Sequence, residues 1–68
     1  MRYQVWEGKL LDASDEGFRI KYDKPSPLFS GQEVHFLLPE SAGLARVIWT
    51  RVDDGWMESG FLVLKLPR

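Results

Sequence analysis

The sequence predicts an all-β fold, a small antiparallel β-barrel of five strands, and three observations support this. Short apolar–polar alternations recur at intervals of about ten residues, and turn-forming residues separate them. No stretch of ten or more residues has the i, i+3, i+4, i+7 apolar pattern of an amphipathic helix. A chain of 68 residues has room for one core, so residues 1–68 are expected to form a single domain.

The five strands are predicted in chain order from their side-chain patterns. Residues 3–11 are apolar but irregular, whereas in residues 18–22 the apolar side chains alternate strictly with Arg19 and Lys21, as in a half-buried strand. A third strand is expected to end at Pro39, because proline has no N–H to donate to a ladder. The predicted strands are residues 3–11, 18–22, 33–38, 44–52 and 56–66.

The segments between the strands contain turn signals. Gly55 is expected to supply the positive φ of a hairpin turn at residues 53–55, and Gly60 to mark a bend or bulge in the last strand. Trp49 and Trp56 flank this turn and are expected mainly to pack in the core, with stacking across the hairpin as a further possibility of the same pattern. The loop at residues 23–32 is expected to tuck Leu28 and Phe29 onto the core, and each strand to pair with its neighbour in the chain.

Composition excludes several classes of protein. The formal net charge is -1, the isoelectric point is near 5.7, and no run of Lys or Arg could follow a phosphate backbone, so a nucleic acid polymer is not the expected partner. The chain has no cysteine, which excludes disulfides and thiolate sites. Polar residues interrupt residues 1–11, so we expect no signal peptide, no membrane span and a cytoplasmic location.

No arrangement typical of an enzyme is present. His35 is the sole histidine, and it is expected at a strand surface with no nucleophile or metal co-ligand near it. The acidic pairs Asp15-Glu16 and Asp53-Asp54 are both in predicted turns, where solvent keeps carboxylates ionised. The sequence also lacks a glycine-rich phosphate loop and a nucleophile elbow. We therefore predict a binding protein without catalytic residues, metal or bound cofactor.

One motif carries more specific information. Residues 12–17, Asp-Ala-Ser-Asp-Glu-Gly, have the form D-x-S-x-x-G directly before the predicted strand 18–22. Asp12 and Ser14 are suited to cap the backbone N–H groups of a tight turn, and Gly17 to adopt a φ that other residues resist. The motif therefore predicts a rigid, outward-facing corner between two strands.

This corner and the strands after it resemble the PilZ family. Residues 31–39 are similar to its G-x-x-V-x-L-x-L-P strand, residues 45–49 to its a-x-V-x-W strand, and residues 60–61 to its closing G-x-x-F, with shortened spacing. The resemblance implies a PilZ-like barrel of the split-barrel type and a bacterial signalling role. It also implies binding of cyclic di-GMP, with Asp12 and Ser14 contacting one guanine and Gly17 completing the corner.

The arginine element of the family is incomplete in this chain. PilZ receptors resemble one another in an R-x-x-x-R element before the corner, whose guanidinium groups bind the two phosphates and the guanines of the messenger. Here Arg2 is the only match, and Trp6 stands where the second arginine would be. The resemblance therefore implies weak binding, or help from a partner chain. Other basic residues expected on outward strand faces are Arg19, Lys21, Arg46 and Arg51.

Two alternatives stay open. A PilZ-like adaptor without nucleotide would use an exposed edge strand near residues 3–11 to bind a protein partner or a second copy of itself as a homodimer. A third hypothesis is an OB-like barrel that stacks single-stranded nucleic acid on Trp6, Phe18 and Trp56, although the aromatic residues mostly fall on the predicted inward faces.

Overall fold

The computed structural model describes residues 5–23 and 28–65, and these residues form an all-β domain with five strands. This confirms the predicted class and number of strands. The first strand begins at Gly8 instead of residue 3 and extends into the D-x-S-x-x-G motif, and residues 3 and 4 lie outside the described part. The strands are β1 (Gly8–Ala13), β2 (Gly17–Tyr22), β3 (Glu33–Leu37), β4 (Ala42–Asp53) and β5 (Trp56–Leu64).

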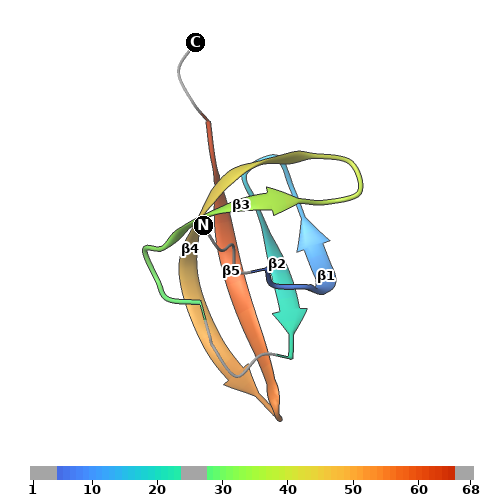
Figure 1. The fold of residues 1–68 in the computed structure, drawn as a ribbon, viewed down its shortest axis with the longest axis vertical. Coiled ribbons are helices and arrows are strands. Elements are labelled where there is room, and N and C mark those ends of the chain that lie inside the picture. The colour runs from blue at the N-terminus through green and yellow to red at the C-terminus, as the bar shows by residue number, and fades with distance from the viewer. Residues whose placement is uncertain (1–4, 24–27, 66–68) are drawn as a thin grey trace.

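The strands form one antiparallel sheet in the order β1-β2-β5-β4-β3 (Figure 1). The expectation that each strand pairs with its neighbour in the chain is therefore wrong for β2 and β3. The connection after β2 returns to β4, where the Gly31 amide donates to the Val47 carbonyl at 2.7 Å, so β3 starts on the far side of β4. Among the described residues no pairing joins the edge strands β1 and β3, and the sheet is not closed into a barrel.

The sheet curls so that its two ends share one core. In Figure 1 β3 crosses the upper part of β5 and β2. The Phe36 ring of β3 lies 4.9 Å from the Phe18 ring of β2, and Phe18 stacks on Phe61 of β5 at 4.7 Å. Offset aromatic pairs of this kind add to the free energy gained by burying apolar area. The buried apolar residues are Phe18, Tyr22, Leu28, Ala45, Val47 and Phe61.

The β4–β5 hairpin has the turn that its sequence predicts. Asp54 has φ 52° and Gly55 has φ 86°, so both central residues of the turn are in the left-handed region, as a two-residue type I′ turn requires. The register places Trp49 opposite Gly60 and Trp56 opposite Asp53. The two tryptophans are therefore not cross-strand partners and do not stack on each other. Trp56 is 44% exposed, so the expectation that it packs in the core is wrong.

The predicted irregularity near Gly60 is present, but the extra residue is in the partner strand. The register shifts between Val47 and Trp49 of β4, which leaves Ile48 as a bulge. The Trp49 indole lies against the Gly60 backbone, and a Cβ at Gly60 would collide with that ring. Glycine at this position therefore provides the surface on which the indole packs.

The loop before β3 meets the core through one of the two predicted residues. Leu28 is buried and its amide donates to the Tyr22 hydroxyl at 3.1 Å, and that hydroxyl also bonds the Ser59 hydroxyl at 2.8 Å. The Phe29 side chain is 70% exposed, so the expectation that it packs on the core is wrong. Its amide is bonded to the Gln32 side chain at 3.1 Å, which holds this turn at the surface.

Candidate functional site

The D-x-S-x-x-G motif forms the corner of the β1–β2 hairpin, and its polar side chains are exposed. The Ser14 amide donates to the Gly17 carbonyl at 2.8 Å and closes the turn. The Ser14 hydroxyl accepts a hydrogen bond from the Glu16 amide at 3.3 Å. Ser14 thus has the turn-capping contact that its position predicts, while its side chain stays open to solvent.

Gly17 has a different role from the expected one. Its φ is not positive, whereas Gly31 and Gly55 are the two described glycines in the left-handed region. Gly17 pairs with Leu62 across β2 and β5, and a Cβ there would collide with the Phe61 carbonyl oxygen. Glycine is therefore required by the close approach of two backbones and not by an unusual φ.

Asp12 is also different from the expected turn cap, because it pairs with an arginine. The Arg19 Nε and Nη2 atoms both donate to Asp12 Oδ2, at 3.1 and 2.8 Å. The hydrogen bond from Arg19 is the main reason that the pKa of Asp12 lies below its usual value of 3.8, and desolvation opposes it. Both hydrogen bonds from Arg19 go to Oδ2, and the Asp12 side chain is 61% exposed, so Oδ1 is open to solvent as an acceptor.

The Asp12–Arg19 pair is the first part of a row of charges across four strands. Arg19 Nη1 donates to Glu58 Oε2 at 3.1 Å, and Arg51 Nη2 donates to Glu58 Oε1 at 3.2 Å. The Glu58 side chain is only 4% exposed, and the Arg51 guanidinium lies 5.5 Å from the centre of the Trp49 ring. These contacts fix the Arg19 guanidinium beside the corner.

A shallow hollow of about 250 Å³ adjoins the corner. One wall is polar and comes from the corner and Arg19, and the other is the Trp49 indole on Gly60. Sites that enclose a drug-sized ligand are larger, at roughly 300–1,000 Å³, so this hollow suits one flat ring of a larger ligand. Its lining residues are Asp12, Ser14, Gly17, Phe18, Arg19, Ile48, Trp49, Gly60 and Phe61.

The remaining predicted residues lie elsewhere. Arg2 is outside the described residues. Arg46 bonds Glu33 at 3.0 Å, and Lys21 lies over Trp56, so neither lines the corner hollow. His35 is exposed on β3, as predicted.

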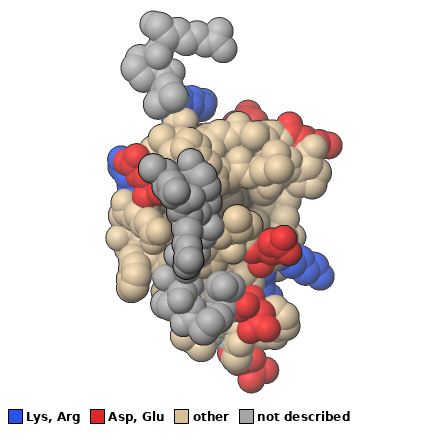
Figure 2. Space-filling view, in the orientation of Figure 1, with Lys and Arg blue, Asp and Glu red and all other residues tan. Residues whose placement is uncertain are grey.

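The three aromatic residues of the OB-like hypothesis do not form one open surface. Phe18 is 5% exposed and Trp6 packs against the core, whereas Trp56 is 44% exposed. In Figure 2 acidic and basic side chains are interspersed around the visible face, with no continuous basic stripe among the described residues in view. Neither feature is typical of a protein that follows a nucleic acid strand.

Sequence reasoning missed Glu58 and Trp49 as neighbours of the corner. The alternation in β5 puts Glu58 on the face opposite Ser59, but its arginine partners follow from the register of three strands, which the sequence does not show. Within residues 5–23 and 28–65, no group of three or more His, Asp or Glu side chains is arranged to hold a metal ion. The described part of the chain also has no helix that is long and apolar enough to cross a membrane.

Comparison of the chain with models of known protein families, with curated proteins and with solved structures finds no match. The likeness to PilZ domains therefore depends on the residues quoted above.

Proposed function

We propose that this chain is a PilZ-like signalling module that binds cyclic di-GMP weakly at the corner hollow, on a fold related to the PilZ split barrel. The observation that carries the proposal is the composition of the hollow. Exposed acceptors of Asp12 and Ser14 face the same space as the Arg19 guanidinium and the Trp49 indole.

The chemistry of the hollow matches the edges of guanine. A guanine base presents O6 and N7 as acceptors and an N2 amino group as a donor. Asp12 Oδ1 and the Ser14 hydroxyl are acceptors for the donor edge, and a guanidinium is a frequent donor to O6 and N7. The Trp49 indole, which packs on Gly60 and lies near Arg51, gives the hollow an aromatic wall. Contact of a base with an aromatic side chain is worth about 1–3 kcal/mol when the two rings stack.

Weak binding is expected from the small volume of the hollow and from the missing charge-assisted hydrogen bonds to the phosphates. The volume of about 250 Å³ admits part of a dinucleotide, so its phosphates would lie outside the hollow. Each missing charge-assisted hydrogen bond lowers the affinity by roughly a factor of ten or more. A second chain that provides arginines would restore this loss.

Calorimetric titration with cyclic di-GMP tests the proposal. The wild type is expected to bind with a dissociation constant on the order of 10–100 μM, and Asp12→Ala to weaken binding at least about tenfold. Asp15→Ala is the matched control, since this exposed carboxylate is in the same turn but does not line the hollow. Ser14→Ala removes the hydroxyl acceptor of the corner and leaves the Asp12–Arg19 pair intact. Absence of heat at ligand concentrations of roughly 500 μM would overturn the proposal.

The second candidate is an adaptor that binds protein through a sheet edge. Its support is that β1 and β3 are unpaired edges among the described residues, and that Leu37 on β3 is 85% exposed. Exposed edges favour strand addition by a partner or a second copy. Sedimentation of the free chain distinguishes self-association from a monomer.

A further inference from the structure

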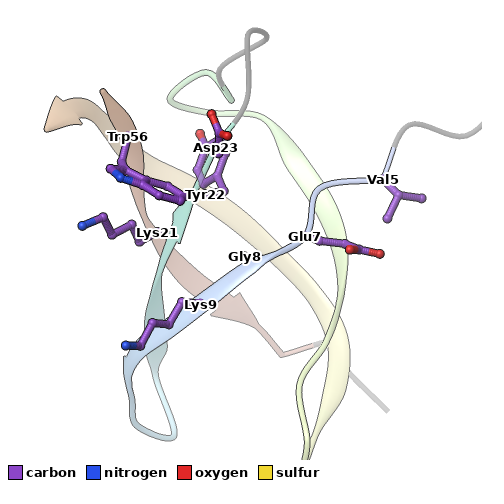
Figure 3. Close-up of a pocket in the computed structure, with 8 residues that line it drawn as sticks. All are labelled: Val5, Glu7, Gly8, Lys9, Lys21, Tyr22, Asp23 and Trp56. Atoms are coloured by element: carbon purple, nitrogen blue, oxygen red, sulfur yellow. The ribbon is translucent and has the colours of Figure 1, made fainter. Parts of the chain in front are cut away.

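A larger hollow lies at the other end of the β1–β2 hairpin, away from the corner (Figure 3). Its volume is about 600 Å³, within the range of sites that bind small molecules. It is formed by the segment entering β1, the end of β2 and the start of β5. The lining residues are Val5, Glu7, Gly8, Lys9, Lys21, Tyr22, Asp23 and Trp56.

Two lysines of this hollow are direct neighbours on adjacent strands. Lys9 and Lys21 are opposite each other in the β1–β2 register, and like charges in this position destabilise a sheet. Among the described residues, no carboxylate oxygen lies within 4.0 Å of the Lys9 or the Lys21 amine. Glu58 is the partner of Lys21 in the β2–β5 register, but its two oxygens bond Arg19 and Arg51.

An aromatic ring lies beside this pair of cations. The Lys21 amine is 5.4 Å from the centre of the Trp56 ring, and Trp56 is 44% exposed. In Figure 3 the Lys9 and Lys21 side chains project in the same direction, and the Glu7 carboxylate points to the opposite side. The hollow therefore has two lysines and an indole on one side, with Asp23 near the indole and Glu7 pointing away from them.

We infer that this hollow binds a small molecule that joins a planar ring to a phosphate, as a nucleoside monophosphate does. A phosphate dianion between Lys9 and Lys21 removes the repulsion between the two amines, and its two charges suit a pair of ammonium groups better than one carboxylate does. The ring contacts the exposed part of Trp56. Hydroxyl or amino groups of the ligand donate to Asp23, which lies near Trp56.

Titration with adenosine monophosphate, followed by backbone and indole resonances in two-dimensional NMR, tests this inference. Saturable shifts are expected at Lys9, Lys21 and the Trp56 indole, with a dissociation constant on the order of 1 mM or lower. Adenosine and inorganic phosphate, each alone, are expected to bind at least about tenfold more weakly, because each makes half of the contacts. Equal binding of phosphate and of the monophosphate would overturn the role of Trp56.

Lysine variants distinguish a specific binding site from a general effect of protein charge on ligand binding. Lys9→Gln and Lys21→Gln are each expected to weaken binding about tenfold or more. Lys65→Gln is the matched control, because it removes the same charge from an exposed lysine outside the hollow. If Lys65→Gln weakens binding as much as Lys21→Gln does, or if no shift saturates, the inference is wrong. Asp12→Ala should leave this binding unchanged, so the result is independent of the proposed corner site.

Discussion

Glu58 is a buried carboxylate on the face of the sheet opposite the core, held between two arginines. Its side chain is 4% exposed, whereas the Arg19 and Arg51 side chains are 41% and 61% exposed. Removing a charge from water is costly unless opposite charges and hydrogen bonds replace the lost solvation. Here each carboxylate oxygen receives one guanidinium hydrogen bond, and these two bonds replace part of the lost solvation.

Neutralising Glu58 should therefore destabilise the domain. We expect Glu58→Gln to lower the free energy of unfolding by about 2 kcal/mol, measured by urea denaturation, because both arginines lose the buried Glu58 anion and Arg19 keeps only Asp12. Glu33→Gln is the matched control. Its carboxylate also bonds an arginine, Arg46, but both side chains are about half exposed, so we expect a loss below about 1 kcal/mol. Equal losses in the two variants would contradict this account of Glu58.

Asp12 should give the domain an acid-dependent contribution to stability. Its pKa is lowered by Arg19, so the folded state favours the ionised form more than the unfolded state does. The contribution is present above the usual carboxyl pKa of 3.8 and is lost as the pH falls through the lower pKa of the folded protein. An NMR titration of the carboxyl carbon should show that Arg19→Gln raises the Asp12 pKa, while Arg46→Gln leaves it unchanged.

At the scale of elements, the β4–β5 hairpin has the clearest link between sequence and structure. Asp54 and Gly55 both adopt positive φ, and this turn matches the right-handed twist of the strands that it joins. The turn fixes a register that runs from Asp53↔Trp56 to Leu44↔Leu64. The register in turn places Trp49 on Gly60 and so forms one wall of the corner hollow.

Gly55→Ala should cost stability through this turn. A side chain at φ 86° is strained by about 1–2 kcal/mol, although no neighbour lies within 4 Å of the added Cβ. Thermal unfolding followed by circular dichroism should therefore show a lower midpoint. Asp54→Asn is the control, since asparagine tolerates the left-handed region as well as aspartate does, and its midpoint should stay close to that of the wild type. An unchanged unfolding midpoint for Gly55→Ala would show that the turn relaxes to another type.

The sequence predicts where the strands are better than it predicts which strands pair with each other. Period-2 alternation identifies β2, and the Asp54-Gly55 pair identifies the last hairpin, because both signals are local. The pairing of β2 with β5 was not predictable, since a strand with one buried face accepts any partner with a matching face. For the same reason the sequence predicts Asp12 and Gly17 in the corner but does not predict Glu58 and Trp49 near them.

At the scale of the whole molecule, the two hollows lie at opposite ends of one hairpin. The corner hollow is at the β1–β2 turn, and the hollow that contains Lys9 and Lys21 is at the open end of the same strands. The row of charges through Glu58 runs across the sheet between the corner and β4. Each hollow therefore has its own charged residues, and substitutions in one should leave ligand binding in the other intact.

The pairing of β2 with β5 also has a consequence for how the chain reaches its native state. Gly17 meets Leu62 across this pair, so a long loop must close before these strands gain any contact energy, whereas β4 and β5 are joined by a two-residue turn. We expect the β4–β5 hairpin to be ordered in the folding transition state and the β1–β2 hairpin to dock afterwards. During synthesis the β1–β2 hairpin would then have no partner strand until β5 has been made.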